Sequence, residues 1–220
     1  MANVNLAELA DRIRASGVPT HFAADQSRLL IAVWRQVVEG LPVSLQQVER
    51  HAKRLNMGAA AATAFIKQLS EQDDQGNIVG IFGLSQREHP HKFILGRKTF
   101  STWCAWDGLF LPPMLGLPAQ IESVCPQSQA QVRVKLTPRG VESCEPTGTV
   151  LSIVEADSAS KGFSCVEEVW AAFCCDGRFF SSESTARQWF SNRERQATIL
   201  TVDEGFELGR LAFRELLGYA

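Results

Sequence analysis

The sequence lacks any apolar run near the roughly 18 residues that a membrane-spanning helix needs, so we predict no membrane-spanning role. It also has little excess charge, because 22 Lys and Arg against 24 Asp and Glu leave a net charge of −2. A near-neutral chain is a poor match for a protein that binds mainly the phosphate backbone of nucleic acid. Residues 1–11 carry no basic patch followed by an apolar core, which a secretory signal requires. We therefore expect a cytoplasmic protein.

The usual metal-binding and disulfide patterns of cysteine are missing too. All six cysteines lie in the second half of the chain, at Cys104, Cys125, Cys144, Cys165, Cys174 and Cys175. No pair shows the two-residue gap that is typical of a structural zinc site. The neighbours Cys174 and Cys175 have Cα atoms about 3.8 Å apart across a trans peptide, which is too close for an unstrained disulfide. We expect free thiols, some of them merely buried.

Residues 1–98 predict a helical region of winged-helix type. Helices are expected at residues 1–16, 27–39, 45–56 and 59–70. Ser44 and Gln47 fit a capping box at the start of the third helix. Two strands, at 78–84 and 92–95, follow around the loop SQREHPH. Helix, turn, helix and hairpin is the order of a winged helix-turn-helix.

DNA binding is nevertheless not expected of this region. The helix that would read bases begins with the sequence GAAAATAF, which offers no side chain for a bidentate base contact. Its single cation, Lys67, lies near the C-terminal end. Residues 1–100 carry 12 basic and 9 acidic side chains, a net charge of only +3. The alternative is a scaffold that packs like a winged helix, and we predict no nucleic-acid partner.

Residues 99–220 predict the catalytic part of an α+β protein, a mixed and mostly antiparallel β core with flanking helices. Strands are expected at 119–124, 131–136, 149–154 and 169–175. Helices are expected at 101–109, closed by Pro112 and Pro113, and at 184–192 and 202–217. The sequence contains no Gly-rich phosphate loop and no serine-hydrolase elbow.

The segment from Ser101 to Asp107 holds the first candidate site. With Ser101 or Thr102 as helix cap, Cys104 lies in the first turn, where the helix dipole lowers the pKa of a thiol. Asp107 follows three residues later and shares the same helix face. A thiol and a carboxylate side by side can exchange one proton. The alternative is a buried structural cysteine followed by a surface aspartate.

The segment from Trp170 to Gly177 holds the second candidate site. It predicts a strand that enters an Asp-Gly turn. Because adjacent strand residues point to opposite faces, at most one of Cys174 and Cys175 is expected to meet Cys104. The spacing leaves open which of them does so.

The chain resembles the alkylmercury lyases (organomercurial lyases) of bacterial mercury resistance. The resemblance rests on FSTWCAWDGLFLP at 100–112 and AAFCCDGRFFSS at 171–182, supported by IESVCPQSQAQVRV at 121–134 and VDEGFELGRLAF at 202–213. The joint occurrence of the W-C-x-x-D helix and the later F-C-C segment is the specific signal. The resemblance implies an enzyme that cleaves the carbon–mercury bond by protonation, releasing a hydrocarbon and Hg(II).

Family roles carry over by position. Cys104 corresponds to the first catalytic cysteine, Asp107 to the catalytic aspartate and Cys174 to the second catalytic cysteine, and these three would also hold mercury as substrate and product. Cys125 corresponds to a structural cysteine and Cys175 to a dispensable neighbour. The resemblance implies no organic cofactor, low-molecular-weight thiols for turnover, and a mercuric reductase as acceptor of Hg(II).

A second hypothesis stays open on the residues alone. It is a non-enzymatic regulator, in which the winged-helix-like region reports on mercury or thiols bound at the cysteine site. Such a regulator would bind operator DNA and turn over no substrate. His89 and His91 flank Pro90 and have no ligand-spaced partner, so we predict a solvated turn there.

Overall fold

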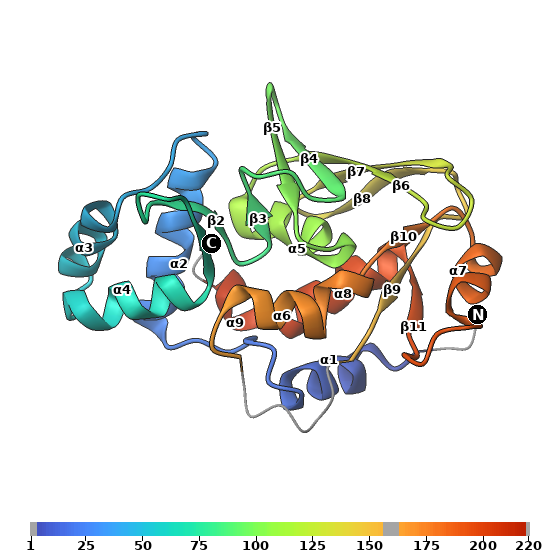
Figure 1. Cartoon of the computed structure of the whole chain (residues 1–220), viewed down its shortest axis with the longest axis horizontal. Coiled ribbons are helices and arrows are strands. Elements are labelled where there is room, and N and C mark those ends of the chain that lie inside the picture. The colour runs from blue at the N-terminus through green and yellow to red at the C-terminus, as the bar shows by residue number, and fades with distance from the viewer. Residues whose placement is uncertain (1–3, 156–162, 219–220) are drawn as a thin grey trace.

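The computed structural model describes residues 4–155 and 163–218 and confirms an α+β fold (Figure 1). An antiparallel sheet of eight strands has the order β1-β2-β3-β5-β4-β6-β7-β8, and a second sheet has the order β10-β9-β11. The strands are β1 (Ser70–Gln72), β2 (Ile78–Ile81), β3 (Leu84–Ser85), β4 (His91–Leu95), β5 (Lys98–Thr102), β6 (Ala119–Val124), β7 (Gln131–Thr137), β8 (Gly140–Glu145), β9 (Val150–Ile153), β10 (Phe179–Phe180) and β11 (Thr198–Thr201).

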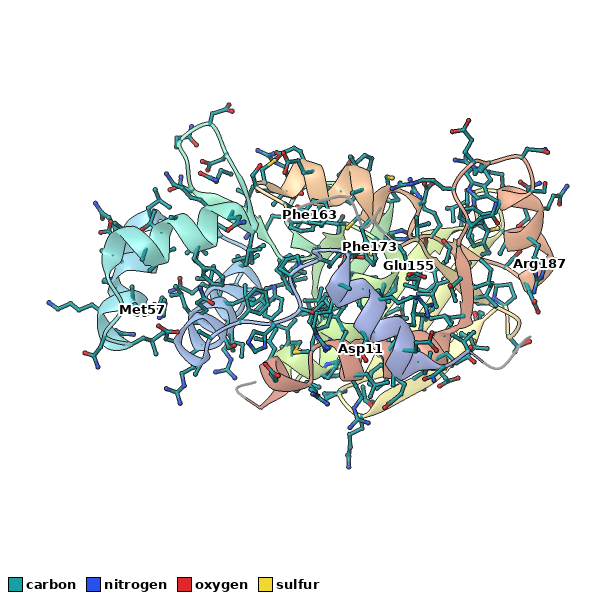
Figure 2. The ribbon with its side chains drawn as sticks, turned by 90° about the horizontal axis from the view of Figure 1, so that it is seen from below. Asp11, Met57, Glu155, Phe163, Phe173 and Arg187 are labelled. Carbon is teal, nitrogen blue, oxygen red and sulfur yellow. The ribbon has the colours of Figure 1, made fainter. Side chains whose placement is uncertain are left out.

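Helices cover both the sheet and one end of the molecule. They are α1 (Leu6–Ala15), α2 (Ala24–Val37), α3 (Leu45–Arg54), α4 (Ala59–Gln68), α5 (Ala105–Leu115), α6 (Val166–Ala172), α7 (Glu183–Phe190), α8 (Val202–Ala212) and α9 (Arg214–Leu217), with a 3₁₀ turn η1 (Cys174–Asp176). Figure 2 shows the elongated arrangement, with Met57 beyond α3 at one end and Arg187 on α7 at the other. No helix in the described ranges combines the length and the apolar character needed to cross a bilayer.

The first four helices form for the reasons expected from sequence. The capping box at α3 is present, with the Gln47 amide donating to Ser44 Oγ and the Ser44 amide donating to Gln47 Oε1. On α2 the apolar stripe is buried, and the Trp34 indole donates to the Ile81 carbonyl at 2.9 Å. The hairpin that follows α4 is β1–β2, whereas the predicted strand at 92–95 lies in β4 and pairs with β5 and β6. The large sheet is therefore continuous across residue 98.

Helix α5 is longer than predicted and differs at both ends. Ser101 and Thr102 belong to β5, so the helix begins at Ala105. Pro112 and Pro113 lie inside the helix, which ends at Gly116 with φ 69°. Nearly every α5 side chain is buried, so tertiary packing outweighs the local preference of proline to end a helix.

Five segments of the second half also differ from prediction. The predicted strand at 169–175 is helix α6 followed by η1, because Val166, Val169 and Phe173 repeat at helical spacing and face the interior. Strands β8, β10 and β11 were not predicted; β10 has only two residues. The predicted helix at 202–217 is interrupted at Phe213, between α8 and α9.

Candidate active site

Cys104 and Asp107 lie at the N-terminus of α5. Cys104 is the residue that caps the helix, and its backbone amide donates to Asp107 Oδ2 at 2.7 Å. Thr102 Oγ1 donates to the Cys104 carbonyl at 2.9 Å and fixes the turn between β5 and α5. The three-residue spacing thus joins the two side chains as expected, although the helix starts later than predicted.

Cys174 reaches the same place from η1, at the end of α6. The two segments are joined by a backbone hydrogen bond from the Ala105 amide to the Gly177 carbonyl, at 2.9 Å. A Cβ on Gly177 would lie 2.9 Å from the Cβ of Cys104, which is closer than two such atoms pack. Only glycine therefore allows the η1 turn to approach α5 this closely.

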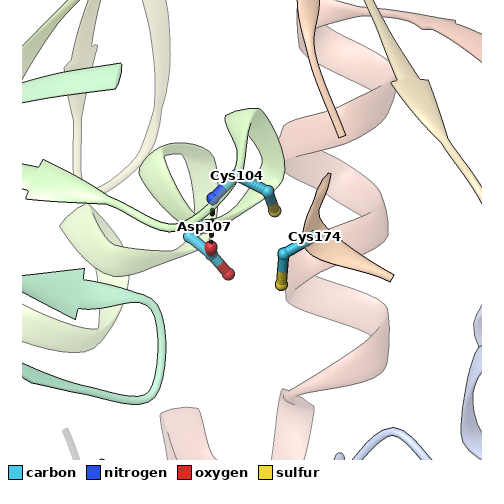
Figure 3. Close-up of side chains that lie close together, drawn as sticks. All are labelled: Cys104, Asp107 and Cys174. Atoms are coloured by element: carbon cyan, nitrogen blue, oxygen red, sulfur yellow. Dashed lines mark hydrogen bonds between the residues drawn. The ribbon is translucent and has the colours of Figure 1, made fainter. Parts of the chain in front are cut away.

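The three predicted side chains converge (Figure 3). The sulfurs of Cys104 and Cys174 and one carboxylate oxygen of Asp107 all lie within 4.8 Å of one another. Cys104 is 0% exposed, Cys174 3% and Asp107 6%. The predicted meeting of Cys104 with one member of the adjacent pair is confirmed, and that member is Cys174. Their catalytic roles stay predictions.

Burial controls the charge of this group. It raises the pKa of Asp107 to about 6, against hydrogen bonds from Cys104 that favour the carboxylate. It also raises the pKa of Cys104. The expectation of a lowered thiol pKa at this helix end is wrong, because desolvation of a fully buried sulfur outweighs the favourable helix end.

The two thiols are not equivalent. Because the Cys174 thiol hydrogen-bonds to Cys104, the pKa of Cys174 is raised well above its usual value, and burial adds to the rise. The same hydrogen bond favours the thiolate of Cys104. Within this hydrogen bond the thiolate of Cys104 is favoured over that of Cys174. Asp107 lies beside both as the one carboxylate of the group.

Two residues that sequence reasoning missed shape the surroundings of the site. Gly83 has φ 91°, and a Cβ there would lie 2.7 Å from Asp107 Cγ. Arg195 donates to the Ala171 and Ala172 carbonyls at the end of α6 and lies 3.5 Å from Asp176 Oδ2. Nothing local in the sequence marks either residue, since both act on segments far away in the chain.

The other candidates take different places. Although burial opposes it, hydrogen bonds from Ser128 and Ser181 lower the pKa of Cys125 to about 7. Cys144, Cys165 and Cys175 are partly buried, and all six cysteines are free thiols. The predicted solvated turn is wrong: His91 is buried and bonded to Ser123 Oγ at 2.7 Å, and His89 contacts Glu71 at 2.8 Å. His91 is the first residue of β4 and is buried, and His89 lies two residues before it and is half-buried.

A narrow apolar pocket leads to the site. It contains about 430 Å³ of empty space, part of it open to solvent, and Asp107 and Cys174 lie in its wall. Aromatic rings supply much of the remaining lining, from Phe82, Trp103, Trp106, Phe110, Phe173 and Phe213. The pocket therefore brings apolar surface directly to the carboxyl group and one sulfur.

A Gly177→Ala substitution is expected to separate the two cysteine segments. The added methyl group would force Cys104 and η1 apart, so we expect the free energy of unfolding to fall by about 1–3 kcal/mol. A displacement of about 1 Å would lower the activity of the site by roughly 10²-fold. Urea unfolding and turnover measurements check both effects.

Gly148→Ala is the matched control, since its Cβ would meet only the Ser181 carbonyl at 3.7 Å, an ordinary contact. Activity in Gly177→Ala equal to that of Gly148→Ala would contradict the close approach inferred here.

Comparisons with known proteins identify the family. A family model described as alkylmercury lyase (MerB) matches residues 84–214. The chain is 31% identical to an alkylmercury lyase of Pseudomonas putida, over 96% of this chain and 92% of that protein. It is 32% identical to an alkylmercury lyase of Streptomyces lividans, over 84% and 83% of the two chains.

A solved structure shares the fold. The crystal structure of the mercury-bound form of MerB2 matches with a TM-score of 0.74 and 20% identity, over 97% of this chain and 100% of that chain. The sequence matches span more than half of the chain and include Cys104, Asp107 and Cys174 within the matched residues. This chain therefore belongs to the alkylmercury lyase family, a family of enzymes.

Proposed function

We propose that the protein is an organomercurial lyase that cleaves the carbon–mercury bond of alkyl- and arylmercury compounds by protonation. The observation that carries this proposal is the buried group of two thiols and one carboxyl within 4.8 Å. Mercury is a soft metal for which thiolates are the preferred ligands. The departing carbon needs a proton, and a carboxyl group at short range can deliver one.

Cys104 acts first, because the hydrogen bond from Cys174 favours its thiolate. The substrate enters as R–Hg–SR′, where SR′ is a thiolate from the medium. The sulfur of Cys104 forms a bond to mercury, the Hg–SR′ bond breaks, and the thiol proton of Cys104 leaves with R′S⁻ as R′SH. The organomercury group is then bound to Cys104 as Cys104–S–Hg–R.

Cys174 and Asp107 complete the cleavage. The thiol proton of Cys174 moves to the Asp107 carboxylate as the sulfur forms a second bond to mercury. This raises the electron density on the metal and weakens the bond to carbon. Asp107 then returns the proton to the carbon, which takes the electron pair of the Hg–C bond and leaves as the hydrocarbon RH. The carboxylate is restored, and Hg(II) stays on the two sulfurs.

Product release needs partners outside the site. Two low-molecular-weight thiols exchange for Cys104 and Cys174, returning their protons to the two sulfurs and leaving as Hg(SR′)₂. The paired cysteines of a mercuric reductase are the alternative acceptor. The scheme needs no organic cofactor, and mercury is a substrate throughout.

The test is turnover itself. Phenylmercury or methylmercury with excess thiol is expected to yield benzene or methane in proportion to enzyme and time, measured by gas chromatography. Enzyme unfolded in urea is the control. Mercury binding with no hydrocarbon above that control would refute the proposal.

The pH dependence should report Asp107. The carboxylate must be ionised to accept the Cys174 proton, and burial raises the pKa of Asp107 to about 6. We expect kcat/KM to be level near neutral pH and to fall about tenfold per pH unit as the pH drops below that value. A steady-state profile from about pH 5 to 8 measures this. A profile with no acid limb, or one with its midpoint near the usual aspartate pKa, would contradict an ionised Asp107 as proton acceptor.

A further inference from the structure

The chemistry fixes where the organic group of the substrate must lie. Mercury(II) with two ligands is linear, so the group R extends away from the sulfur that holds the metal. Its reacting carbon must also lie beside Asp107 to receive the proton. The pocket described above is lined by both Asp107 and Cys174. It offers apolar surface to a hydrocarbon at the place where the scheme needs one.

The lining of this pocket comes from distant parts of the chain. Val18, Pro19, Gln68 and Leu69 lie before the segment matched by the family model. Val166, Val169 and Phe173 belong to α6 and the residue after it. Phe163 and Phe173, labelled in Figure 2, precede and follow α6 in the chain. The Gln68 side-chain amide donates to the Phe163 carbonyl at 2.7 Å and ties the two parts of the chain together.

We propose that this pocket is the subsite for the organic group, that it favours an aryl group over methyl, and that Leu69 and Val169 in its lining set that preference. The inference rests on the proposed lyase function. It also assigns a role to the helical N-terminal region, which contributes part of the lining of the substrate subsite.

Burial and ring content support the aryl preference. Leu69 is 6% exposed and Val18 7%, so these side chains already pack against the interior rather than solvent. A phenyl group would meet aromatic rings at the end of the pocket nearest the site, among them Trp106 and Phe110, which pack 5.6 Å apart at 75°. Edge-to-face contacts of this kind favour an aromatic guest. A methyl group offers less apolar surface to this lining than a phenyl group does.

The test compares two substrates across variants. The ratio of kcat/KM for phenylmercury to that for methylmercury mixes binding with the intrinsic reactivity of each carbon–mercury bond. The intrinsic reactivity of each substrate is the same for every variant. A change in the ratio from one variant to another therefore measures the effect of the pocket lining on substrate selectivity. Leu69→Ala removes apolar surface from the lining, and Val169→Phe places a larger side chain at a half-buried position of the lining.

We expect each variant to lower the phenyl-to-methyl ratio by about tenfold, with the methylmercury rate changed little. Leu41→Ala and Val124→Phe are matched controls at exposed positions, 71% and 42% exposed, and should keep the wild-type ratio. Because Leu69 is buried, Val169→Phe provides the second readout if Leu69→Ala unfolds.

The outcomes separate the two claims. A wild-type enzyme that releases hydrocarbon, with ratios unchanged in both pocket variants, overturns the subsite and leaves the lyase function standing. A wild-type enzyme that releases no hydrocarbon from either substrate overturns both.

Discussion

Replacing either cysteine of the site by serine, Cys104→Ser or Cys174→Ser, is expected to reduce hydrocarbon release to the level of the uncatalysed reaction. The reason is that a hydroxyl is a hard ligand with little affinity for mercury. Without Cys104 the substrate is not captured, and without Cys174 the metal stays two-coordinate and the carbon is not activated. This is the largest effect that the account predicts.

The two variants should differ in what they retain. Cys174→Ser still offers Cys104 as one sulfur, so it should bind one equivalent of phenylmercury more than the double variant that lacks both Cys104 and Cys174, measured by mercury analysis after gel filtration. Cys104→Ser should capture substrate poorly, because the proposed scheme assigns the first bond to mercury to Cys104. Equal capture by both variants would contradict the order in which the sulfurs act.

Folding has to be checked, since each serine places a hydroxyl in a dry site. An unpaired buried hydroxyl costs about 1–3 kcal/mol, so both variants should remain folded but lose some stability to urea. Cys144→Ser is the matched control on β8, where the thiol is only partly buried, and it should keep full activity. Loss of activity in Cys144→Ser would show that the assay reports general damage.

Asp107→Ser is expected to bind the organomercury substrate and to cleave it about 10²–10⁴-fold more slowly than wild type, the usual contribution of a general acid. Serine retains a hydroxyl, yet at neutral pH it neither accepts the Cys174 proton nor delivers one to carbon. Single-turnover release of benzene, with bound mercury measured in parallel, separates cleavage from capture.

Asp107→Ser is also expected to destabilise the start of α5, because Asp107 Oδ2 accepts a hydrogen bond from the Cys104 amide there. Asp107→Asn keeps an acceptor oxygen for that amide and removes the acid, so it should show the same slow cleavage with better stability. Wild-type rates in Asp107→Asn would mean that the proton comes from another group.

The sequence predicted those parts of the site that depend on local spacing. Cys104 and Asp107 lie three residues apart, and this spacing alone joins a capping residue to the third residue of a helix. The capping of α3 by Ser44 and the strands β6 and β7 were predictable on the same grounds. The meeting with Cys174 was expected from the family resemblance, because the spacing of the adjacent cysteines left two choices.

What the sequence did not reveal depends on distant contacts. The pKa of Cys104 is raised because the whole fold removes water from it, which no local pattern reports. Gly83 and Gly177 matter because of what faces them, Asp107 and Cys104 respectively. The segment at 169–175 was predicted as a strand, whereas Val166, Val169 and Phe173 repeat at helical spacing and the segment forms α6 and η1.

The division of the chain at residue 98 remains a prediction. The large sheet crosses it, since β4 pairs with β5 on one side and with β6 on the other. Residues before it also line the pocket that leads to Asp107. We therefore expect the N-terminal region to be needed for a complete substrate subsite.

The central claim, that two sulfurs and one carboxyl group act on a single metal, is tested most directly by one turnover without added thiol. Phenylmercury mixed with excess enzyme should give one benzene per mercury, and the mercury should remain on the protein with two sulfur ligands by X-ray absorption. In Cys174→Ser the mercury should show one protein sulfur and keep its phenyl group. Benzene released in full while the wild-type protein holds mercury through a single sulfur would contradict the account.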